Sequence, residues 1–119
     1  MAIKGLGMDA VELSRIEKIV VEPKSFLEKV LTPKELEKYH TLPFKRKVEF
    51  LAGRFAAKEA YAKALGTGIG QHVSFQDIEV FNDAEGKPVL VCARYSHQTW
   101  ISITHTNHDA YAVVVLESN

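Results

Sequence analysis

The chain has 119 residues, of which 46% are hydrophobic and 25% charged, and its fifteen basic residues balance its fifteen acidic ones. This length and composition predict one globular domain over residues 1–119. Zero net charge leaves no overall field to attract nucleic acid or a membrane surface, and the longest apolar run, residues 110–116, is far shorter than a membrane helix. The single cysteine, Cys92, excludes an internal disulfide, and no secretory signal pattern is visible. A cytosolic enzyme or binding module is therefore favoured.

The N-terminal third is predicted to form a strand followed by helices. Residues 2–9 are short, partly apolar and glycine-containing, which predicts a strand that ends near Asp9. Residues 12–21 have apolar side chains at helical spacing, and Pro23 closes that segment. The next helix begins with a capping box that has proline in its first turn. Its residues are Thr32, Pro33 and Glu35.

The longest helical pattern runs over residues 45–65 and stops at Gly66, as at a left-handed helix cap. One stripe of this helix is predicted to face inward, and its members are Val48, Leu51, Ala52, Phe55, Glu59 and Ala62. The outer sides are predicted to be basic, through Lys45, Arg46, Lys47, Arg54 and Lys58.

The C-terminal half is predicted to be antiparallel β structure. Residues 75–81 and 89–94 are strands on either side of a turn-rich segment, 82–88, and residues 100–106 and 110–117 form a second pair. A strand, then helices, then an antiparallel meander is typical of an α+β fold.

The first candidate for chemistry is the run Gly5-Leu6-Gly7-Met8-Asp9. On a strand, Gly5, Gly7 and Asp9 share a face. Two glycines on one face indicate close approach by another backbone or a ligand. The Asp9 carboxylate then has two interpretations that do not exclude each other, a metal ligand or the cap of the following helix.

Glu59 and Lys63 form the second candidate. The inward stripe turns the Glu59 carboxylate toward the core or a crevice, and Lys63 follows one helical turn later. The pair is either an ordinary helix ion pair or a carboxylate that holds a divalent cation beside a lysine that holds phosphate.

Two further segments have an ordinary and a functional interpretation. The loop 66–70 (GTGIG) follows a helix, which makes it neither a Walker loop nor a dinucleotide fingerprint. It is either a plain helix stop or a concavity of backbone N–H groups for an anion. His105, within residues 102–106, is either a phosphate or proton-exchange group or a surface histidine at a hairpin turn.

Taken together, these segments resemble one enzyme family. The strongest matches are residues 5–16 (GLGMDAVELSRI) and 54–68 (RFAAKEAYAKALGTG), supported by 75–80, 86–88 and 102–106. In this order and spacing they resemble the holo-acyl-carrier-protein synthases, the small bacterial 4′-phosphopantetheinyl transferases, over essentially the whole chain. The resemblance implies that family's α+β fold, an antiparallel sheet packed against a long helix and shorter helices.

The resemblance also implies a reaction, in which coenzyme A donates 4′-phosphopantetheine to a serine of apo acyl carrier protein and adenosine 3′,5′-bisphosphate is released. By analogy, Asp9 and Glu59 hold Mg²⁺ against the pyrophosphate and Lys63 stabilises its charge. The group that deprotonates the serine stays open between a metal-held water activated by Glu59 and Asp9. The residues implied for coenzyme A binding are Arg46, Arg54, Lys63, Gly66, Gly68, His105 and Thr106.

Acyl carrier protein is acidic, and the resemblance implies that basic residues at the first helix bind it. The matching positions are Arg15, Lys18 and Lys24, although the acidic residues Glu12, Glu17 and Glu22 make this segment less basic than that role favours. The family is trimeric, with coenzyme sites between subunits. A catalytically silent coenzyme A-binding or assembly module is the alternative, and the presence of Asp9, Glu59 and Lys63 argues against it.

Overall fold

The computed structural model describes residues 2–22 and 24–118, without the side chain of Lys24. Its helices are α1 (Leu13–Val21), α2 (Lys24–Val30), α3 (Pro33–His40), α4 (Phe44–Leu65) and the short 3₁₀ turn η1 (Phe75–Asp77). Its strands are β1 (Ile3–Glu12), β2 (Ile78–Asn82), β3 (Pro88–Cys92), β4 (Gln98–His105) and β5 (Asp109–Glu117).

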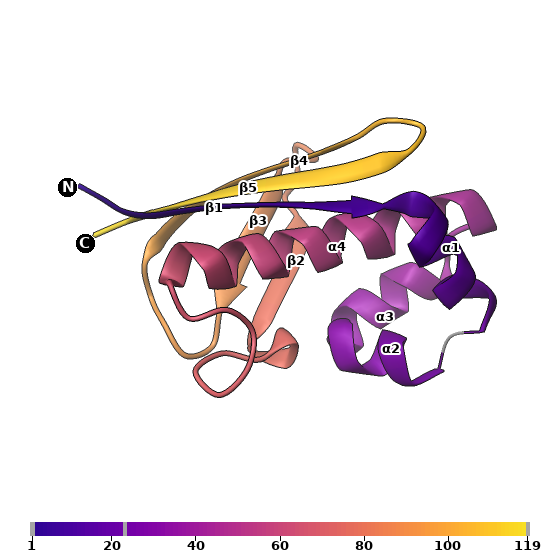
Figure 1. The fold of residues 1–119 in the computed structure, drawn as a ribbon, viewed down its shortest axis with the longest axis horizontal. Coiled ribbons are helices and arrows are strands. Elements are labelled where there is room, and N and C mark those ends of the chain that lie inside the picture. Colours follow the sequence, from indigo (N-terminus) through magenta and orange to yellow (C-terminus); the bar gives the residue numbers. More distant parts are fainter. Residues whose placement is uncertain (1, 23, 119) are drawn as a thin grey trace.

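The elements form the α+β arrangement predicted from the sequence. The long helix α4 runs along a three-stranded antiparallel sheet in the order β1-β5-β4, while α1, α2 and α3 gather at one end of the molecule (Figure 1). The predicted meander is divided, because β2 and β3 pair in a second sheet of their own and β1 joins β5. None of the helices in the described part of the chain is long and apolar enough to be a membrane span.

Strand β1 and helix α4 touch backbone to backbone. A Cβ atom on Gly5 would lie 2.0 Å from the Ala64 carbonyl oxygen, and one on Gly7 would lie 1.9 Å from that of Ala60. No side chain fits there, so the close approach predicted from the two glycines is confirmed. It places the next residue on that strand face, Asp9, beside α4.

The predicted helix ends are confirmed where they depend on local chemistry. At α3, Thr32 Oγ1 accepts from the Glu35 N–H at 3.3 Å and Glu35 Oε1 accepts from the Thr32 N–H at 2.9 Å. Helix α4 ends at Gly66, whose φ of 87° is left-handed. The segment predicted as a strand from residue 75 instead starts with η1.

The interpretation of Asp9 as a helix cap is wrong. Strand β1 continues to Glu12, and α1 starts at Leu13 with Glu12 as its N-cap and no side-chain hydrogen bond there. Pairing with β5 extends through Glu12 opposite Asp109, which keeps the chain extended past Asp9. Pro23, predicted to close the helix, lies outside the described residues, and α1 ends at Val21.

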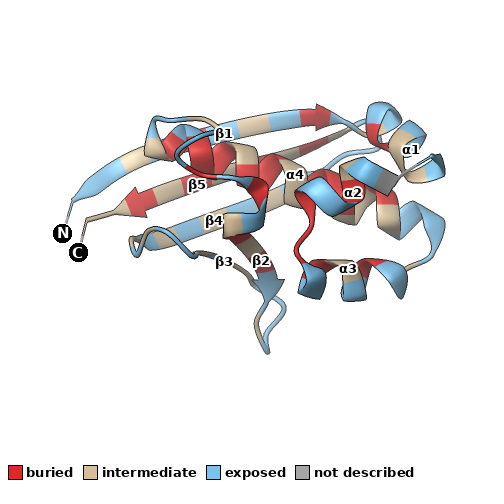
Figure 2. Ribbon diagram, turned by 90° about the horizontal axis from the view of Figure 1, so that it is seen from below, coloured by how far each residue is buried: buried red, intermediate tan, exposed pale blue. Residues whose placement is uncertain are grey.

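The prediction that Lys58 lies on an outer, basic side of the long helix is also wrong. Lys58 is fully buried, three residues after Phe55 and four before Ala62, on the face of α4 that meets α2, α3 and η1. Figure 2 shows how buried residues concentrate along α4. Burial lowers the pKa of the Lys58 amine, and the neighbouring Glu35 carboxylate opposes that shift.

Candidate active site

The structure brings together the three residues predicted to carry the chemistry. Asp9 comes from β1, and Glu59 and Lys63 come from successive turns of α4. Lys63 Nζ donates to Asp9 Oδ1 at 3.0 Å and to the Met8 carbonyl oxygen at 3.1 Å. Lys63 is therefore paired with a residue of β1, and the helix ion pair with Glu59 is not among the ion pairs of the described residues.

The carboxylate of Glu59 lies under the influence of the charges of Asp9 and Lys63. Burial raises the pKa of Glu59 above its ordinary value, the negative charge of Asp9 raises it further, and Lys63 opposes the shift. A divalent cation between Asp9 and Glu59 would remove this repulsion, and carboxylate oxygens suit Mg²⁺. No group of three or more possible ligands occurs among the described His, Cys, Asp and Glu residues. Mg²⁺ typically uses one or two carboxylates together with substrate phosphates and water. The donor set thus fits Mg²⁺.

A cavity of about 320 Å³ opens beside these carboxylates. Its polar lining comes from Asp9, Glu59 and Arg15, so a residue predicted only for carrier binding lies next to the reacting groups. The rest of its wall is apolar and consists of Ala10, Val11, Ile16, Ile19, Phe26 and Phe55. Sequence reasoning did not predict Ile19 and Phe26 as residues of the site. In the sequence nothing distinguishes them from other apolar residues.

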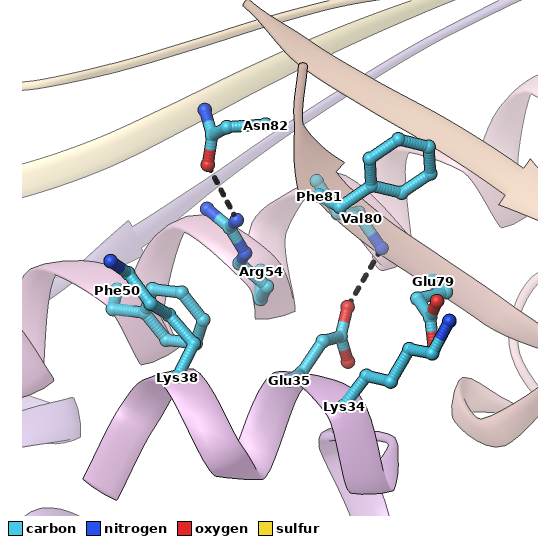
Figure 3. Close-up of a pocket in the computed structure, with 9 residues that line it drawn as sticks. All are labelled: Lys34, Glu35, Lys38, Phe50, Arg54, Glu79, Val80, Phe81 and Asn82. Carbon is cyan, nitrogen blue, oxygen red and sulfur yellow. Dashed lines mark hydrogen bonds between the residues drawn. The ribbon is translucent and has the colours of Figure 1, made fainter. Parts of the chain in front are cut away.

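Arg54 lies in a different cavity of about 590 Å³ between α3, α4 and β2 (Figure 3). Its Nη2 donates to Asn82 Oδ1 at 3.0 Å, and its guanidinium carbon lies 4.1 Å from the centre of the Phe50 ring. Burial lowers the pKa of Arg54. Lys34 and Lys38 of α3 also line this cavity, as do Glu35 and Glu79, so its lining carries charges of both signs.

Arg46, His105 and Thr106 lie near the N-terminal end of α4. Glu49 Oε1 is 3.9 Å from Arg46 Nη1 and 4.0 Å from His105 Nε2. Thr106 Oγ1 accepts from the N–H groups of His108 and Asp109, each at 3.0 Å, so its hydroxyl already stabilises the β4–β5 turn. His105 and Thr106 line a cavity of about 250 Å³.

The interpretation of the glycine loop as a concavity of free N–H groups is wrong for its first three residues. The N–H groups of Thr67 and Gly68 donate to the Ala62 carbonyl oxygen at 3.2 and 3.1 Å, and that of Gly66 donates to Lys63 O at 2.9 Å. These donors complete the last turn of α4, as in a helix stop. Coenzyme contacts by Gly66 and Gly68 stay a prediction.

The residues predicted for the carrier protein are only partly described. Arg15 and Lys18 are exposed on α1, and the side chain of Lys24 lies outside the described part of the chain. Lys18 borders a shallow hollow with Glu17 and Glu22, so the acidic neighbours seen in the sequence do surround it.

Known proteins share this sequence and fold. The sequence model of the 4′-phosphopantetheinyl transferase superfamily matches residues 5–116. The chain is 53% identical over 116 residues to the holo-[acyl-carrier-protein] synthase of Bacillus subtilis (strain 168), covering 97% of this chain and 96% of that protein. The corresponding enzyme of Lactobacillus helveticus (strain DPC 4571) is 50% identical over 115 residues, covering 97% of this chain and 98% of that one.

Solved structures agree. A Bacillus anthracis str. Ames holo-(acyl-carrier-protein) synthase in complex with CoA (3′,5′-ADP) superposes with a TM-score of 0.92 at 51% identity, over 98% of both chains. A Helicobacter pylori holo-[acyl-carrier-protein] synthase in complex with coenzyme A superposes with a TM-score of 0.83 at 37% identity, over 94% of this chain and 99% of that one. With the meeting of Asp9, Glu59 and Lys63, these matches establish that the chain belongs to the holo-[acyl-carrier-protein] synthase family of the 4′-phosphopantetheinyl transferase superfamily.

Proposed function

We propose that this chain transfers the 4′-phosphopantetheine group of coenzyme A to a serine of apo acyl carrier protein, which activates the carrier for fatty acid biosynthesis. The observation that carries this proposal is that Asp9 lines one cavity with Glu59 and also accepts a hydrogen bond from Lys63. Family membership supports it, as do the coenzyme A complexes of the two bacterial relatives.

Asp9 and Glu59 are the residues we propose to hold Mg²⁺. When bound, the ion supplies positive charge against the pyrophosphate of coenzyme A. Phosphoryl-type transfer depends mainly on positioning and on neutralising the charge that develops on oxygen. The negative charge of Asp9 helps to raise the pKa of Glu59, and a cation between the two carboxylates would remove this repulsion.

Lys63 acts on the leaving phosphate of the reaction, and Glu59 acts on the attacking serine hydroxyl. The serine hydroxyl oxygen forms a bond to the phosphorus that carries pantetheine, and the bond to the bridging oxygen breaks, which releases adenosine 3′,5′-bisphosphate. Glu59 takes up the hydroxyl proton as the general base. The Lys63 ammonium stabilises the departing phosphate and provides a proton to it.

The nucleotide end of coenzyme A is proposed to lie between two copies of the chain. Arg46 and Gly66, both predicted contacts, lie at opposite ends of α4, about 30 Å apart at 1.5 Å per residue. One nucleotide cannot reach both on a single chain. We therefore propose that Arg46, Arg54, His105 and Thr106 of one subunit complete the site of another, in a homotrimer.

An exposed apolar surface supports such an assembly. On the outer face of the three-stranded sheet, Leu6 and Trp100 both lie opposite Val115, and Met8 lies opposite Val113. Leu6, Met8 and Trp100 are 66%, 60% and 46% exposed. A contiguous apolar sheet face of this kind is typical of a protein–protein interface.

The carrier protein is proposed to dock at α1. Arg15 lies in the same cavity as Asp9 and Glu59, so an acidic residue of the carrier that pairs with Arg15 brings its serine close to the metal site. Lys18 and Lys24 complete the proposed contact. Since both substrates belong to cytoplasmic metabolism, we propose that location for the enzyme.

The test is intact-mass spectrometry of apo acyl carrier protein after incubation with the protein, coenzyme A and Mg²⁺. We expect a mass gain of one phosphopantetheine that EDTA abolishes and Mg²⁺ restores. A carrier that gains no mass, while coenzyme A still raises the melting temperature of the protein, would refute transfer and identify a silent coenzyme-binding module.

A further inference from the structure

A charged side chain lies in the core directly next to the active-site glutamate. Lys58 has no solvent exposure, and its amine donates three hydrogen bonds. The acceptors are Glu35 Oε1 at 2.6 Å, the Val30 carbonyl oxygen at 2.6 Å and the Phe75 carbonyl oxygen at 3.2 Å. An ammonium group has three protons, so each has its own acceptor.

The partner carboxylate is equally well satisfied. Besides Lys58, Glu35 Oε1 accepts from the Thr32 N–H at 2.9 Å, and Glu35 Oε2 accepts from the Val80 N–H at 2.7 Å (Figure 3). The Lys58–Glu35 pair thus bonds the ends of α2 and η1, the start of α3 and the strand β2 to the middle of α4. Such a convergence fixes positions of elements that are far apart in the sequence.

Stability alone does not account for the pair. Replacing a buried ion pair by apolar side chains of similar volume is often neutral or stabilising, because two charges no longer lose their hydration. The role of the pair is better explained by the fixed relative positions of the segments that it bonds.

Two of the segments that Lys58 bonds, α2 and η1, form a row of aromatic rings together with α4 beside the active site. Phe26 of α2 lies 5.6 Å from Phe55 of α4, and Phe55 is stacked on Phe75 of η1 at 5.7 Å, both between ring centres. Phe26 and Phe55 line the cavity that contains Asp9 and Glu59. Lys58 therefore anchors the segments that carry this aromatic wall, one residue before Glu59.

We propose that the Lys58–Glu35 pair positions the aromatic wall and the turn of α4 that carries Glu59, which makes Lys58 a positioning residue for the transfer reaction. The inference rests on the proposed function. It assigns Lys58 no contact with either substrate: the pair acts by keeping Glu59 and the wall of its cavity in one arrangement.

The test removes both charges together, because removal of one alone leaves the other buried without a partner. The double variant Lys58→Met/Glu35→Gln keeps side-chain volumes similar. We expect kcat to fall about 10- to 100-fold, as small misplacements of reacting groups do, while KM for coenzyme A stays nearly unchanged. Amide hydrogen exchange in residues 26–30 and 75–80 should become faster. The matched control is Glu28→Gln/Lys29→Met, which removes one negative and one positive charge from exposed residues of α2. We expect this control to have the kinetics and the hydrogen exchange of the wild type.

A folded double variant with wild-type kcat would overturn the proposal. If the double variant does not fold, Glu35→Asp is tested in its place. This substitution keeps both charges but moves the carboxylate away from Lys58, because the side chain is shorter by one methylene group. A severalfold lower kcat at unchanged KM for coenzyme A would support the positioning role, and an unchanged kcat would overturn it. A wild-type protein that transfers nothing would refute the proposed function instead.

Discussion

At the scale of single residues, Glu59 is the group on which the chemistry depends most. It shares a cavity with Asp9, and its pKa is raised by burial and by that neighbour. We expect Glu59→Gln to lower kcat about 10²- to 10⁴-fold, because the amide neither accepts the serine proton nor holds a cation as a carboxylate does. Transfer measured by carrier mass is the readout. The control is Glu37→Gln, an exposed glutamate of α3, and near-normal transfer by Glu59→Gln would remove Glu59 from the site.

The same substitution tests the electrostatics without any turnover. A carboxyl whose pKa is raised in the folded state favours folding while protonated, and this contribution is lost as the pH rises through the raised pKa. Without metal at pH 7, Glu59→Gln should therefore unfold at a higher denaturant concentration than the wild type, and the gap should narrow below the ordinary glutamate pKa of 4.5. Lower stability of Glu59→Gln at pH 7 would contradict this origin of the shift. Mg²⁺ should stabilise the wild type alone.

At the scale of secondary-structure elements, the approach of β1 to α4 determines where Asp9 lies. A methyl group on Gly7 would meet the Ala60 carbonyl oxygen at 1.9 Å, and backbone cannot move aside as a side chain does. We expect Gly7→Ala to lower the free energy of unfolding by about 3 kcal/mol or more, the upper range for overpacking. Urea denaturation is the measurement.

The control for Gly7→Ala is Gly53→Ala on α4 itself. A methyl group there lies 3.2 Å from the Cγ2 methyl group of Ile103, a contact that a small shift of that side chain relieves, and alanine favours the helix by about 1 kcal/mol. The stability of Gly53→Ala should stay within about 1 kcal/mol of the wild type. Equal effects of the two substitutions would mean that the contact between β1 and α4 is not the cause.

A substitution on helix α1 is expected to affect binding of the carrier protein but not binding of coenzyme A. Arg15 is exposed and borders the cavity of Glu59. We expect Arg15→Glu to raise KM for the acidic carrier about tenfold or more at low salt, with little change in KM for coenzyme A. Steady-state kinetics at two ionic strengths measure this. Lys29→Glu, on the exposed surface of α2, controls for net charge, and an unchanged carrier KM in Arg15→Glu would place the interface elsewhere.

At the scale of the whole molecule, assembly and activity are expected to be coupled. Met8 is 60% exposed on the outer face of the sheet, and a carboxylate buried there costs several kcal/mol. We expect Met8→Glu to be monomeric by light scattering and to lose transfer in proportion, since its nucleotide contacts come from another copy. Val21→Glu replaces a residue of α1 that is 65% exposed and should remain trimeric. A monomeric wild type with full activity would refute the trimer.

The features that the sequence predicted correctly are those decided by residues close together in the chain. The capping box at Thr32 and Glu35 and the left-handed end of α4 at Gly66 are where the local pattern placed them, because hydrogen bonds and dihedral angles within a few residues decide them. The two glycines of β1 also predicted close approach by another backbone or a ligand, but not that the backbone of α4 makes it.

The tertiary structure decided what joins distant segments. Lys63 pairs with Asp9, 54 positions away, and Lys58 enters the core because Glu35, 23 positions away, meets it there. Periodicity cannot distinguish a lysine on a solvated face from one that a distant carboxylate neutralises. Nor could periodicity show that β1 joins β5 and stays extended past Asp9 to Glu12, since long-range pairing decides both. The sequence by itself thus determined the local elements and the residue types for the chemistry, whereas packing alone decided which of them meet.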